Sequence, residues 1–272
     1  MPIVEEYTES SINGNKIPKR IILTYKTKSV DTFPNFYKRC LDKMLYFFND
    51  YEVKIFDDDE MERLVIQFDK NLYEIYKDKK IIEKTDIFRL VALYTYGGIY
   101  MDLDVLLTKS PREYISSCDK DVILCAEKNQ SCQPYEIFLN SKLKYVMFSN
   151  YFIASIVKAK FIYECILYIL IINSNPKKEI FDNPFLPEYQ IILYTGIFDK
   201  TIGINYINID KKYKKESMSR CDILCRTGPY LVTKVYYDNE KLQESIDILR
   251  NKNGTDNFVG DYGEHHYLGY GY

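Results

Sequence analysis

Lys84–Leu107 is the segment that most constrains what this chain can fold into. Its sequence, KTDIFRLVALYTYGGIYMDLDVLL, predicts a helix, a glycine stop and a strand that ends in two carboxylates. Apolar side chains of the expected helix recur at i, i+3, i+4 and i+7, as an amphipathic helix requires, at Ile87, Leu90, Val91 and Tyr94. Because glycine commonly follows the last residue of a helix, Gly97 and Gly98 predict where it ends. Such a tight turn brings the helix and the acidic strand side by side.

The first half of this helix carries an acid and a base on a stripe of their own. We expect Thr85 or Asp86 to act as the helix cap or as an acid of the first turn. Asp86 and Arg89 lie three residues apart and away from the apolar face. An exposed pair at this spacing stabilises a helix by only roughly 0.2–0.5 kcal/mol. The spacing alone therefore indicates no more than an ordinary ion pair.

The two carboxylates at the end of the segment admit two interpretations. In an extended strand Asp102 and Asp104 share one face, while the other face is apolar, with Met101, Leu103, Val105 and Leu107. Mg²⁺ and Mn²⁺ take oxygen ligands, often one or two carboxylates together with substrate phosphates, so the pair suits a divalent cation. The alternative is a solvated strand edge with two acids, because an Asp-x-Asp triplet is frequent by chance.

The remaining pattern alternates short apolar runs with helical periods. We expect strands at Ile17–Tyr25, Tyr51–Phe56 and Asp121–Ala126, a mixture of strand and turn at Tyr145–Ile156, a strand-like run at Ile202–Ile209, and helices at Phe36–Phe48, Met61–Phe68 and Phe161–Ile172. The acids Asp57, Asp58 and Asp59 precede a helix and are best explained as its cap and first-turn acids. This order predicts an α/β fold with a mostly parallel sheet covered on both faces and ligands beyond the carboxyl ends of its strands.

Composition excludes several classes of function. The 272 residues contain 37 Lys and Arg against 39 Asp and Glu, a net charge of −2, so we expect no nucleic-acid partner. The most apolar run, Phe161–Ile172, is too short to span a bilayer, and the acidic start MPIVEEYTES contains no signal-peptide pattern. The seven cysteines have no metal-site spacing and indicate free thiols in a reducing compartment. We therefore expect a cytoplasmic protein with no integral membrane segment.

The ordered string from Asp86 to Val105 resembles a known signature. It combines Asp86-x-x-Arg89 with the run YGGIYMDLDV at fixed offsets, and it is similar to the motif of the family 32 glycosyltransferases. These DxD-containing enzymes are related to yeast alpha-mannosyltransferases, capsular polysaccharide enzymes and glucosylating toxins. The resemblance implies a GT-A-type Rossmann-like domain in which Asp102 and Asp104 bind a metal and the nucleotide-sugar. It also implies that Asp86 and Arg89 contact the donor sugar.

Three further segments extend the resemblance. Ile17-Pro18-Lys19 through Thr27 resembles the opening strand of the family, in which an aromatic residue at the position of Tyr25 stacks on the nucleotide base. By the same carry-over we expect Thr24 and Gly98 at the nucleotide-sugar. Asn150–Ser155 resembles an Asn-containing segment near the acceptor side, and Thr227-Gly228-Pro229 resembles a TGP motif, for which a plain turn is an equally good interpretation.

The histidines of the chain are both in its tail. His265 and His266 stand in HHYLGYGY, which resembles the HHWAGSW ending of the family, with Gly271 where its last Trp would fall. In related transferases the histidine before x-x-G completes the metal site, which implies His266 as the third protein ligand and His265 as the alternative. A surface location or a tag remnant would also account for two adjacent histidines.

Together these resemblances imply one domain of residues 1–272. Its first part, about residues 15–130, would bind the donor, and an irregular second part, about residues 131–272, would bind the acceptor and supply the metal-site tail. The implied activity is Mn²⁺- or Mg²⁺-dependent, retaining transfer from a UDP- or GDP-linked sugar to a hydroxyl acceptor such as a glycan, as in polysaccharide biosynthesis. Two alternatives stay open, a degenerate transferase that acts as a sugar-binding scaffold and a haloacid-dehalogenase-like phosphatase.

Overall fold

A six-stranded sheet forms the centre of the molecule. The computed structural model describes residues 17–127, 147–174, 223, 226–251 and 259–268. The strand order is β2-β1-β3-β6-β5-β7, and the strands are β1 (Arg20–Thr24), β2 (Glu52–Phe56), β3 (Gly98–Met101), β5 (Val122–Glu127), β6 (Met147–Ser155) and β7 (Ile246–Leu249). Among these strands only β6 runs against the others, since it pairs antiparallel with both β3 and β5. The prediction of a mostly parallel sheet is confirmed.

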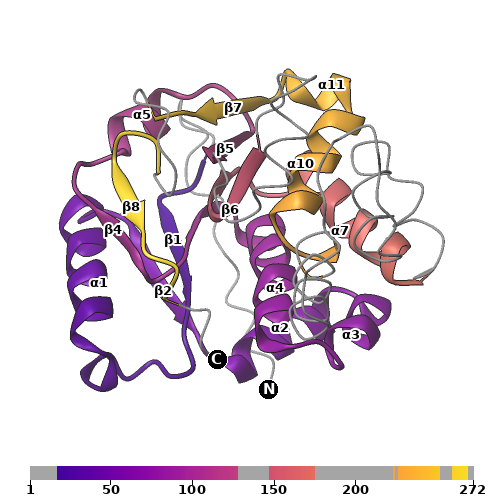
Figure 1. Cartoon of the computed structure of the whole chain (residues 1–272), viewed down its shortest axis with the longest axis horizontal. Coiled ribbons are helices and arrows are strands. Elements are labelled where there is room, and N and C mark those ends of the chain that lie inside the picture. The colour runs from indigo at the N-terminus through magenta and orange to yellow at the C-terminus, as the bar shows by residue number, and fades with distance from the viewer. Residues whose placement is uncertain (1–16, 128–146, 175–222, 224–225, 252–258, 269–272) are drawn as a thin grey trace, which may run out of the picture.

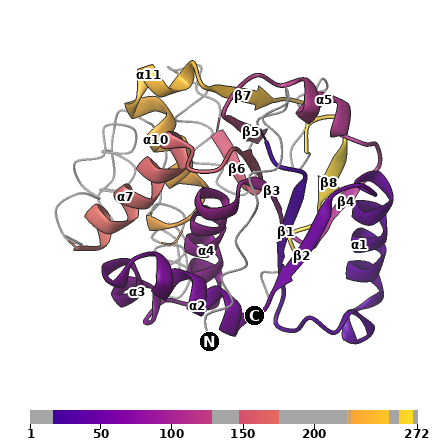
Figure 2. The same cartoon turned by 180° about the vertical axis from the view of Figure 1, so that it is seen from behind.

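Helices cover both faces of the sheet, as expected. Figures 1 and 2 show α1 (Asn35–Phe47) on one side, beside the small pair of strands β4 (Val105–Leu107) and β8 (Gly263–His265). On the other side lie α2 (Asp58–Phe68), α3 (Lys70–Tyr76), α4 (Ile81–Tyr96), α7 (Lys160–Ser174) and α10 (Pro229–Asp238). The shorter helices are η1 (Val30–Thr32), α5 (Arg112–Ser117) and α11 (Glu240–Gln243). No helix in the described ranges is long and apolar enough to cross a membrane.

Strand alternation divides the core into two parts. Ile22 and Tyr100 point into the cluster formed with α2, α3, α4, α7 and α10, whereas Ile21 and Ile99 point into the cluster formed with α1, α5 and β4. Successive side chains of a strand face opposite sides, so each sheet strand contributes to both clusters. The sheet is thus buried on both faces, which explains why its strands read as apolar runs.

The expected strands and helices that fall within the described residues are present, with ends that differ by a few residues. Asp57 caps α2 and forms a capping box with Glu60, as the acidic run predicted. The cap prediction for α4 was wrong, because this helix begins at Ile81, and its first-turn acid is Glu83, which accepts from the Lys80 amide. Thr85 and Asp86 therefore lie inside the helix.

The expected mixture of strand and turn at 145–156 was also wrong, because β6 is continuous over Met147–Ser155. The structure accommodates Ser149 by a hydrogen bond to the Cys125 carbonyl, next to an irregularity in the β5–β6 register. The strand-like run expected at 202–209 lies outside the described residues. Cys40, Cys118, Cys125 and Cys165 are free thiols, and the other cysteines are not among the described residues.

Gly97 and Gly98 connect α4 to β3, as predicted. Gly97 is the C-terminal cap of α4 with φ +60°, and Gly98 begins β3 with φ +100°. A Cβ at Gly98 would lie 2.6 Å from the Arg20 carbonyl oxygen of the neighbouring strand β1. Only glycine combines this backbone conformation with so close an approach.

We predict that Gly98→Ala lowers the free energy of unfolding by about 1–3 kcal/mol, because it adds both a strained φ and a contact with backbone. Chemical denaturation of the purified variant measures this loss. Leu45→Ala is the control, since Leu45 is 44% exposed on α1, and its effect should stay within about 0.5 kcal/mol. Equal stability of the two variants would contradict the assigned role of Gly98.

Candidate active site

The Asp-x-Asp motif lies in a turn where the chain leaves the central sheet. Strand β3 ends at Met101, and β4 (Val105–Leu107) begins after Asp104. The Val105 amide donates to the Asp102 carbonyl over 3.1 Å, while the Asp102 amide donates to the Tyr151 carbonyl of β6 over 2.9 Å. The expectation of one extended strand through both acids was therefore wrong. The two carboxylates converge because of a turn and not because of strand alternation.

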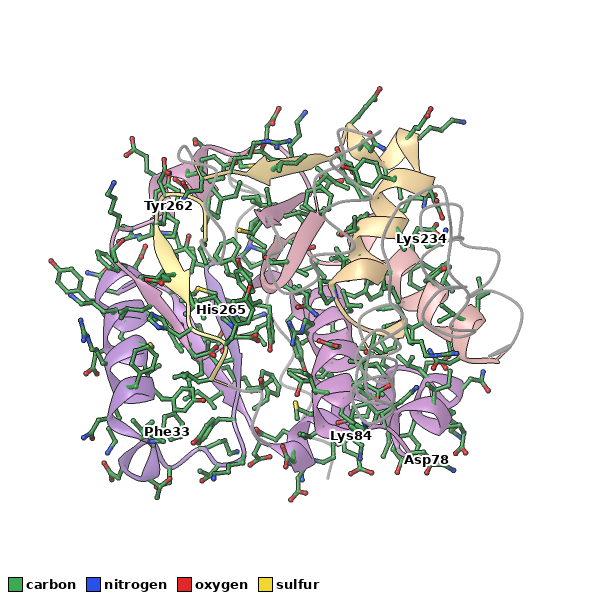
Figure 3. All side chains as sticks on the ribbon, viewed as in Figure 1. Phe33, Asp78, Lys84, Lys234, Tyr262 and His265 are labelled. Carbon is green, nitrogen blue, oxygen red and sulfur yellow. The ribbon has the colours of Figure 1, made fainter. Side chains whose placement is uncertain are left out.

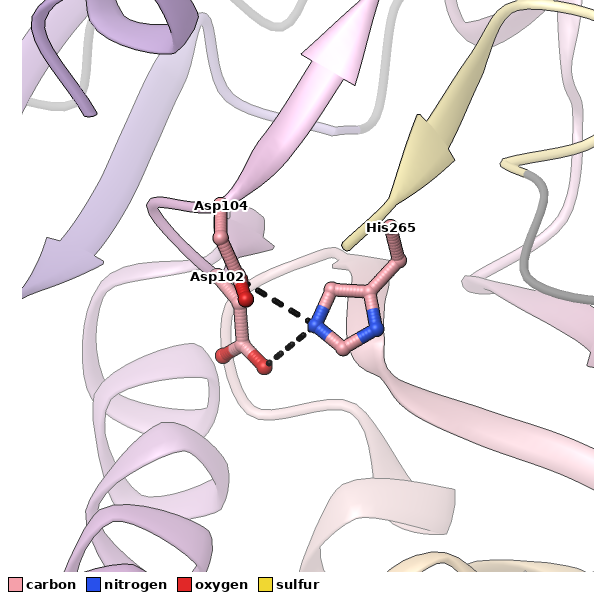
Figure 4. A group of neighbouring side chains, drawn as sticks. All are labelled: Asp102, Asp104 and His265. Carbon is pink, nitrogen blue, oxygen red and sulfur yellow. Dashed lines mark ion pairs between the residues drawn. The ribbon is translucent and has the colours of Figure 1, made fainter. Parts of the chain in front are cut away.

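A histidine from the tail meets these two carboxylates. Strand β8 (Gly263–His265) pairs antiparallel with β4, and Val105 is opposite His265. The Nε2 atom of His265 lies 3.1 Å from Asp104 Oδ1 and 3.5 Å from Asp102 Oδ2 (Figure 4). In Figure 3 this histidine lies at the lower end of the yellow strand β8. Asp102, Asp104 and His265 thus form one group whose potential ligand atoms lie within 4.8 Å of one another.

His266, the ligand that the resemblance implied first, does not face this group, whereas His265, the stated alternative, does. Its ring packs edge-on against Phe36 of α1 at 4.7 Å, and its Nε2 lies 4.0 Å from Glu264. Neighbouring residues at the end of a strand point in opposite directions. The register of β8 with β4 turns His265 toward Asp102 and Asp104, and His266 then points away.

The tail is also bound through its backbone. The Leu268 amide donates to Asp104 Oδ2 over 2.7 Å, and the His266 amide donates to the Asp104 carbonyl over 3.3 Å. Between them Tyr267 has φ +52°, a left-handed conformation that is uncommon for a residue with a Cβ. Asp104 therefore serves as the attachment point of the tail as well as a candidate ligand.

The donor set fits a hard divalent cation such as Mn²⁺ or Mg²⁺. Two carboxylates and an imidazole nitrogen point toward one place, and such an arrangement needs a positive charge between them. Without a metal a proton supplies that charge. Burial disfavours the imidazolium, but hydrogen bonds to Asp102 and Asp104 outweigh it and raise the pKa of His265 to about 9. The buried Nδ1 of His265 has no hydrogen-bond partner among the described residues.

Arg89 connects the acid of the helix to the first acid of the motif. Its Nη2 lies 3.1 Å from Asp86 Oδ1 and 3.6 Å from Asp102 Oδ1, and its guanidinium lies 4.6 Å from the centre of the Tyr100 ring. Asp86 and Arg89 are both 4% exposed, so the surface ion pair that the spacing suggested is in fact a buried one. Arg89 also donates through Nη1 to the Asn150 carbonyl.

These charges perturb the acids in opposite directions. Burial raises the pKa of Asp86 to about 6, although Arg89 favours its ionised form. Burial also acts against ionisation of Asp102, but there Arg89 and the hydrogen bond from His265 outweigh it and lower the pKa to about 2. Both groups are carboxylates at neutral pH, so the site carries concentrated negative charge beside the buried Arg89 and, without a metal, the protonated His265.

Three residues of the site were not among the predicted site residues. Tyr100 donates to Asp102 Oδ1 over 2.7 Å, Asn150 Nδ2 donates to Asp86 Oδ1 over 2.8 Å, and Thr227 Oγ1 donates to Asp86 Oδ2 over 3.1 Å. The Asn150 and TGP segments were the sequence signals for two of them. Tyr100 lies within the signature string itself, but its apolar neighbours gave no indication of a polar role.

The residues expected at the nucleotide-sugar lie in different places. Thr24 ends β1 and its hydroxyl lies 3.3 Å from the Tyr100 hydroxyl, which links it to Asp102. The Tyr25 ring is 9% exposed and packs against Phe33 at 4.4 Å. Gly98 lies at the opposite end of β3 from Asp102, against the backbone of β1. The structure therefore brings Thr24 to the site but gives Gly98 a place in the sheet.

Residues 34–128 match the family model described as "Glycosyltransferase sugar-binding region containing DXD motif". This segment of the chain is therefore similar to DXD-containing glycosyltransferases. It runs from the start of α1 to the end of β5 and includes Asp86, Arg89 and both acids of the motif. The matched segment thus includes the turn and the buried pair, while the histidine tail lies beyond it.

Two individual proteins of the same class of enzyme are also similar to this chain. The chain is 34% identical over 98 residues to Inositol phosphoceramide mannosyltransferase 3 of Schizosaccharomyces pombe, a match that covers 33% of this chain and only 24% of that relative. The ligand-free glycosyltransferase domain of the YGT toxin is similar in fold, with a TM-score of 0.51, 12% identity, and coverage of 86% of this chain and 80% of that one. The GT-A-type fold expected from the sequence is confirmed.

We predict that His265→Ala weakens Mn²⁺ binding by at least about tenfold, because loss of a ligand nitrogen leaves two carboxylates to hold the ion. Isothermal titration of the purified chain with Mn²⁺ measures the affinity. His266→Ala is the matched control and should change it by less than about threefold, as its ring points toward Phe36. The reverse order of the two variants would restore His266 as the ligand.

The raised pKa of His265 also gives a pH dependence. Below about pH 9 the metal-free imidazole carries a proton, which a metal ion has to displace, so Mn²⁺ affinity should rise with pH between about 6.5 and 8.5. Titrations in buffers of different ionisation enthalpy should show about one proton released per ion bound. His266→Ala should keep this release and His265→Ala should lose it. A pH-independent affinity would contradict the arrangement.

Proposed function

We propose that the chain is a metal-dependent, retaining glycosyltransferase that moves a sugar from a nucleotide-sugar to a hydroxyl acceptor, such as a glycan. The observation that carries the proposal is the group of Asp102, Asp104 and His265 beside the buried Asp86–Arg89 pair. We propose further that residues 1–272 act as one domain, with the donor bound mainly by its first half.

The residues of the site have separate tasks in this proposal. Asp102, Asp104 and His265 hold the divalent cation, Mn²⁺ or Mg²⁺. When bound, that ion would supply Lewis-acid stabilisation of the charge that develops on the diphosphate leaving group. Asp86 accepts a hydroxyl of the donor sugar, and Arg89 fixes Asp86 relative to Asp102 through its contacts with both. The contribution of the chain is then mainly positioning and electrostatic complementarity.

The carboxylates of the site support retention without an enzyme nucleophile. Asp86 is held by Arg89, Asn150 and Thr227, and Asp102 accepts from Tyr100 and contacts Arg89 and His265. Asp104 contacts His265 and the Leu268 amide. Each acid in this described site is therefore held by several groups, so we propose that the acceptor hydroxyl attacks on the same face as the leaving group, without a covalent intermediate.

The name of the fission yeast relative suggests where to begin with the donor. It is a mannosyltransferase whose named acceptor is inositol phosphoceramide. We therefore propose GDP-mannose as the first donor to test and keep UDP-linked hexoses as the alternative. For the acceptor we propose only a hydroxyl group, since the match covers a minor part of that relative.

A thermal-shift screen of GDP-mannose and UDP-hexoses with Mn²⁺ tests this function, because a true donor stabilises the folded state by mass action. Donor hydrolysis by the stabilised complex should then depend on Mn²⁺. We predict that Asp104→Asn lowers this hydrolysis at least about 100-fold without loss of the fold, since it removes a negative ligand. Asp238→Asn, at a surface ion pair with Lys234, is the control and should retain the wild-type rate.

Three outcomes would overturn the proposal. An unchanged rate in Asp104→Asn would remove the metal assignment. Release of phosphate from an aryl phosphate, with no response to any nucleotide-sugar, would favour a phosphatase. Binding of a sugar nucleotide without hydrolysis or transfer to any hydroxyl acceptor would favour a sugar-binding scaffold.

A further inference from the structure

Thr227 joins a distant part of the chain to the acid of α4. Its hydroxyl donates to Asp86 Oδ2 over 3.1 Å, although the two residues are 141 positions apart. Thr227 is 1% exposed and immediately precedes Gly228, the N-terminal cap of α10. The carbonyl of Ile223 is also within reach at 3.3 Å, but the carboxylate is nearer and charged. A hydroxyl has one hydrogen to donate, and a charged acceptor makes the stronger bond.

The two oxygens of Asp86 are used unequally. Oδ1 faces Arg89 Nη2 at 3.1 Å and accepts from Asn150 Nδ2 at 2.8 Å. Within the described residues Oδ2 accepts from Thr227 alone. A carboxylate oxygen can accept about two hydrogen bonds. Oδ1 is therefore filled by the protein, whereas Oδ2 retains one acceptor position next to the Thr227 hydroxyl.

A threonine within α10 itself has different partners. Thr233 Oγ1 donates to the Pro229 carbonyl over 2.9 Å and accepts from the Phe148 amide of β6 over 3.0 Å. It is 5% exposed, so it is nearly as buried as Thr227. Thr233 attaches α10 to the sheet, whereas Thr227 attaches its entry to Asp86. The chain thus offers two buried threonines for comparison. Thr233 bonds to backbone groups of the scaffold, and Thr227 bonds to an acid of the candidate site.

We propose that Thr227 is a positioning residue for the donor sugar, which fixes the Asp86 carboxylate so that Oδ2 can accept one sugar hydroxyl. This inference rests on the proposed function. Loss of the Thr227 hydroxyl leaves Oδ2 without its protein partner, and rotation of the carboxylate about its bond to Cβ is then restrained only through Oδ1. Arg89 and Asn150 still hold Oδ1, so the effect falls on the orientation of Oδ2 and less on the charge of the site.

The test compares isosteric and conservative variants with the donor that the thermal-shift screen identifies. Thr227→Val should lower kcat/KM for that donor by at least about tenfold, the loss expected for a hydrogen bond to a charged group. Most of it should be a rise in donor KM. Thr227→Ser keeps the hydroxyl and should stay within about threefold of wild type. Thr233→Val, the matched control, should lower Tm while donor kcat/KM stays within about threefold.

A double-mutant cycle shows whether Thr227 acts through Asp86. In an Asp86→Asn background, Thr227→Val should cost less than about threefold in kcat/KM, because the carboxylate that it orients is already absent. A Thr227→Val enzyme with wild-type donor kinetics would overturn the inference. So would a full tenfold loss in the Asp86→Asn background, or equal losses from Thr227→Val and Thr233→Val. An inactive wild-type protein would instead contradict the proposed function.

Discussion

The position of Arg89 between two acids is the interaction on which the candidate site depends. Its guanidinium faces Asp86 within α4 and Asp102 in the turn after β3, and it donates to the Asn150 carbonyl of β6. A buried charge without a partner is costly, and removing one member of a buried pair leaves the other unpaired. Arg89 therefore sets the relative placement of the helix, the turn and the antiparallel strand. The surrounding hydrogen bonds from Tyr100 and Thr227 refine that arrangement.

The fold explains how these groups come together. The Gly97–Gly98 connection returns the chain directly from α4 into β3, so the acid of the helix and the acids of the turn lie on adjoining elements. Because β6 runs against β3, its residues at Asn150 and Tyr151 lie beside the end of β3. The antiparallel strand β6 thus supplies polar groups to the carboxyl end of β3, where the motif is located.

The sequence predicted the parts of this site that are close together in the chain. The period of α4, the two glycines and the offsets of Asp86, Arg89, Asp102 and Asp104 are local features, and a local pattern carries them. The turn at Asp102 was missed because its apolar neighbours continue the alternation expected of a strand. Asn150 and Thr227 are 64 and 141 residues from their partner Asp86, so only the folded sheet and the packing of α10 bring them into contact.

The choice between His265 and His266 also depends on contacts between residues that are distant in the sequence. Two adjacent histidines are equivalent in composition, and the spacing favoured His266 over its alternative His265, whereas the observed geometry brings His265 to the two acids. What decides between them is register: Val105 is opposite His265, and a shift of one residue in a strand pair would exchange the two faces. The register is itself held at Asp104, which binds the His266 and Leu268 amides. Asp104, the second acid of the motif, therefore determines which histidine faces the site, because the backbone contacts that attach the tail to Asp104 also orient His265.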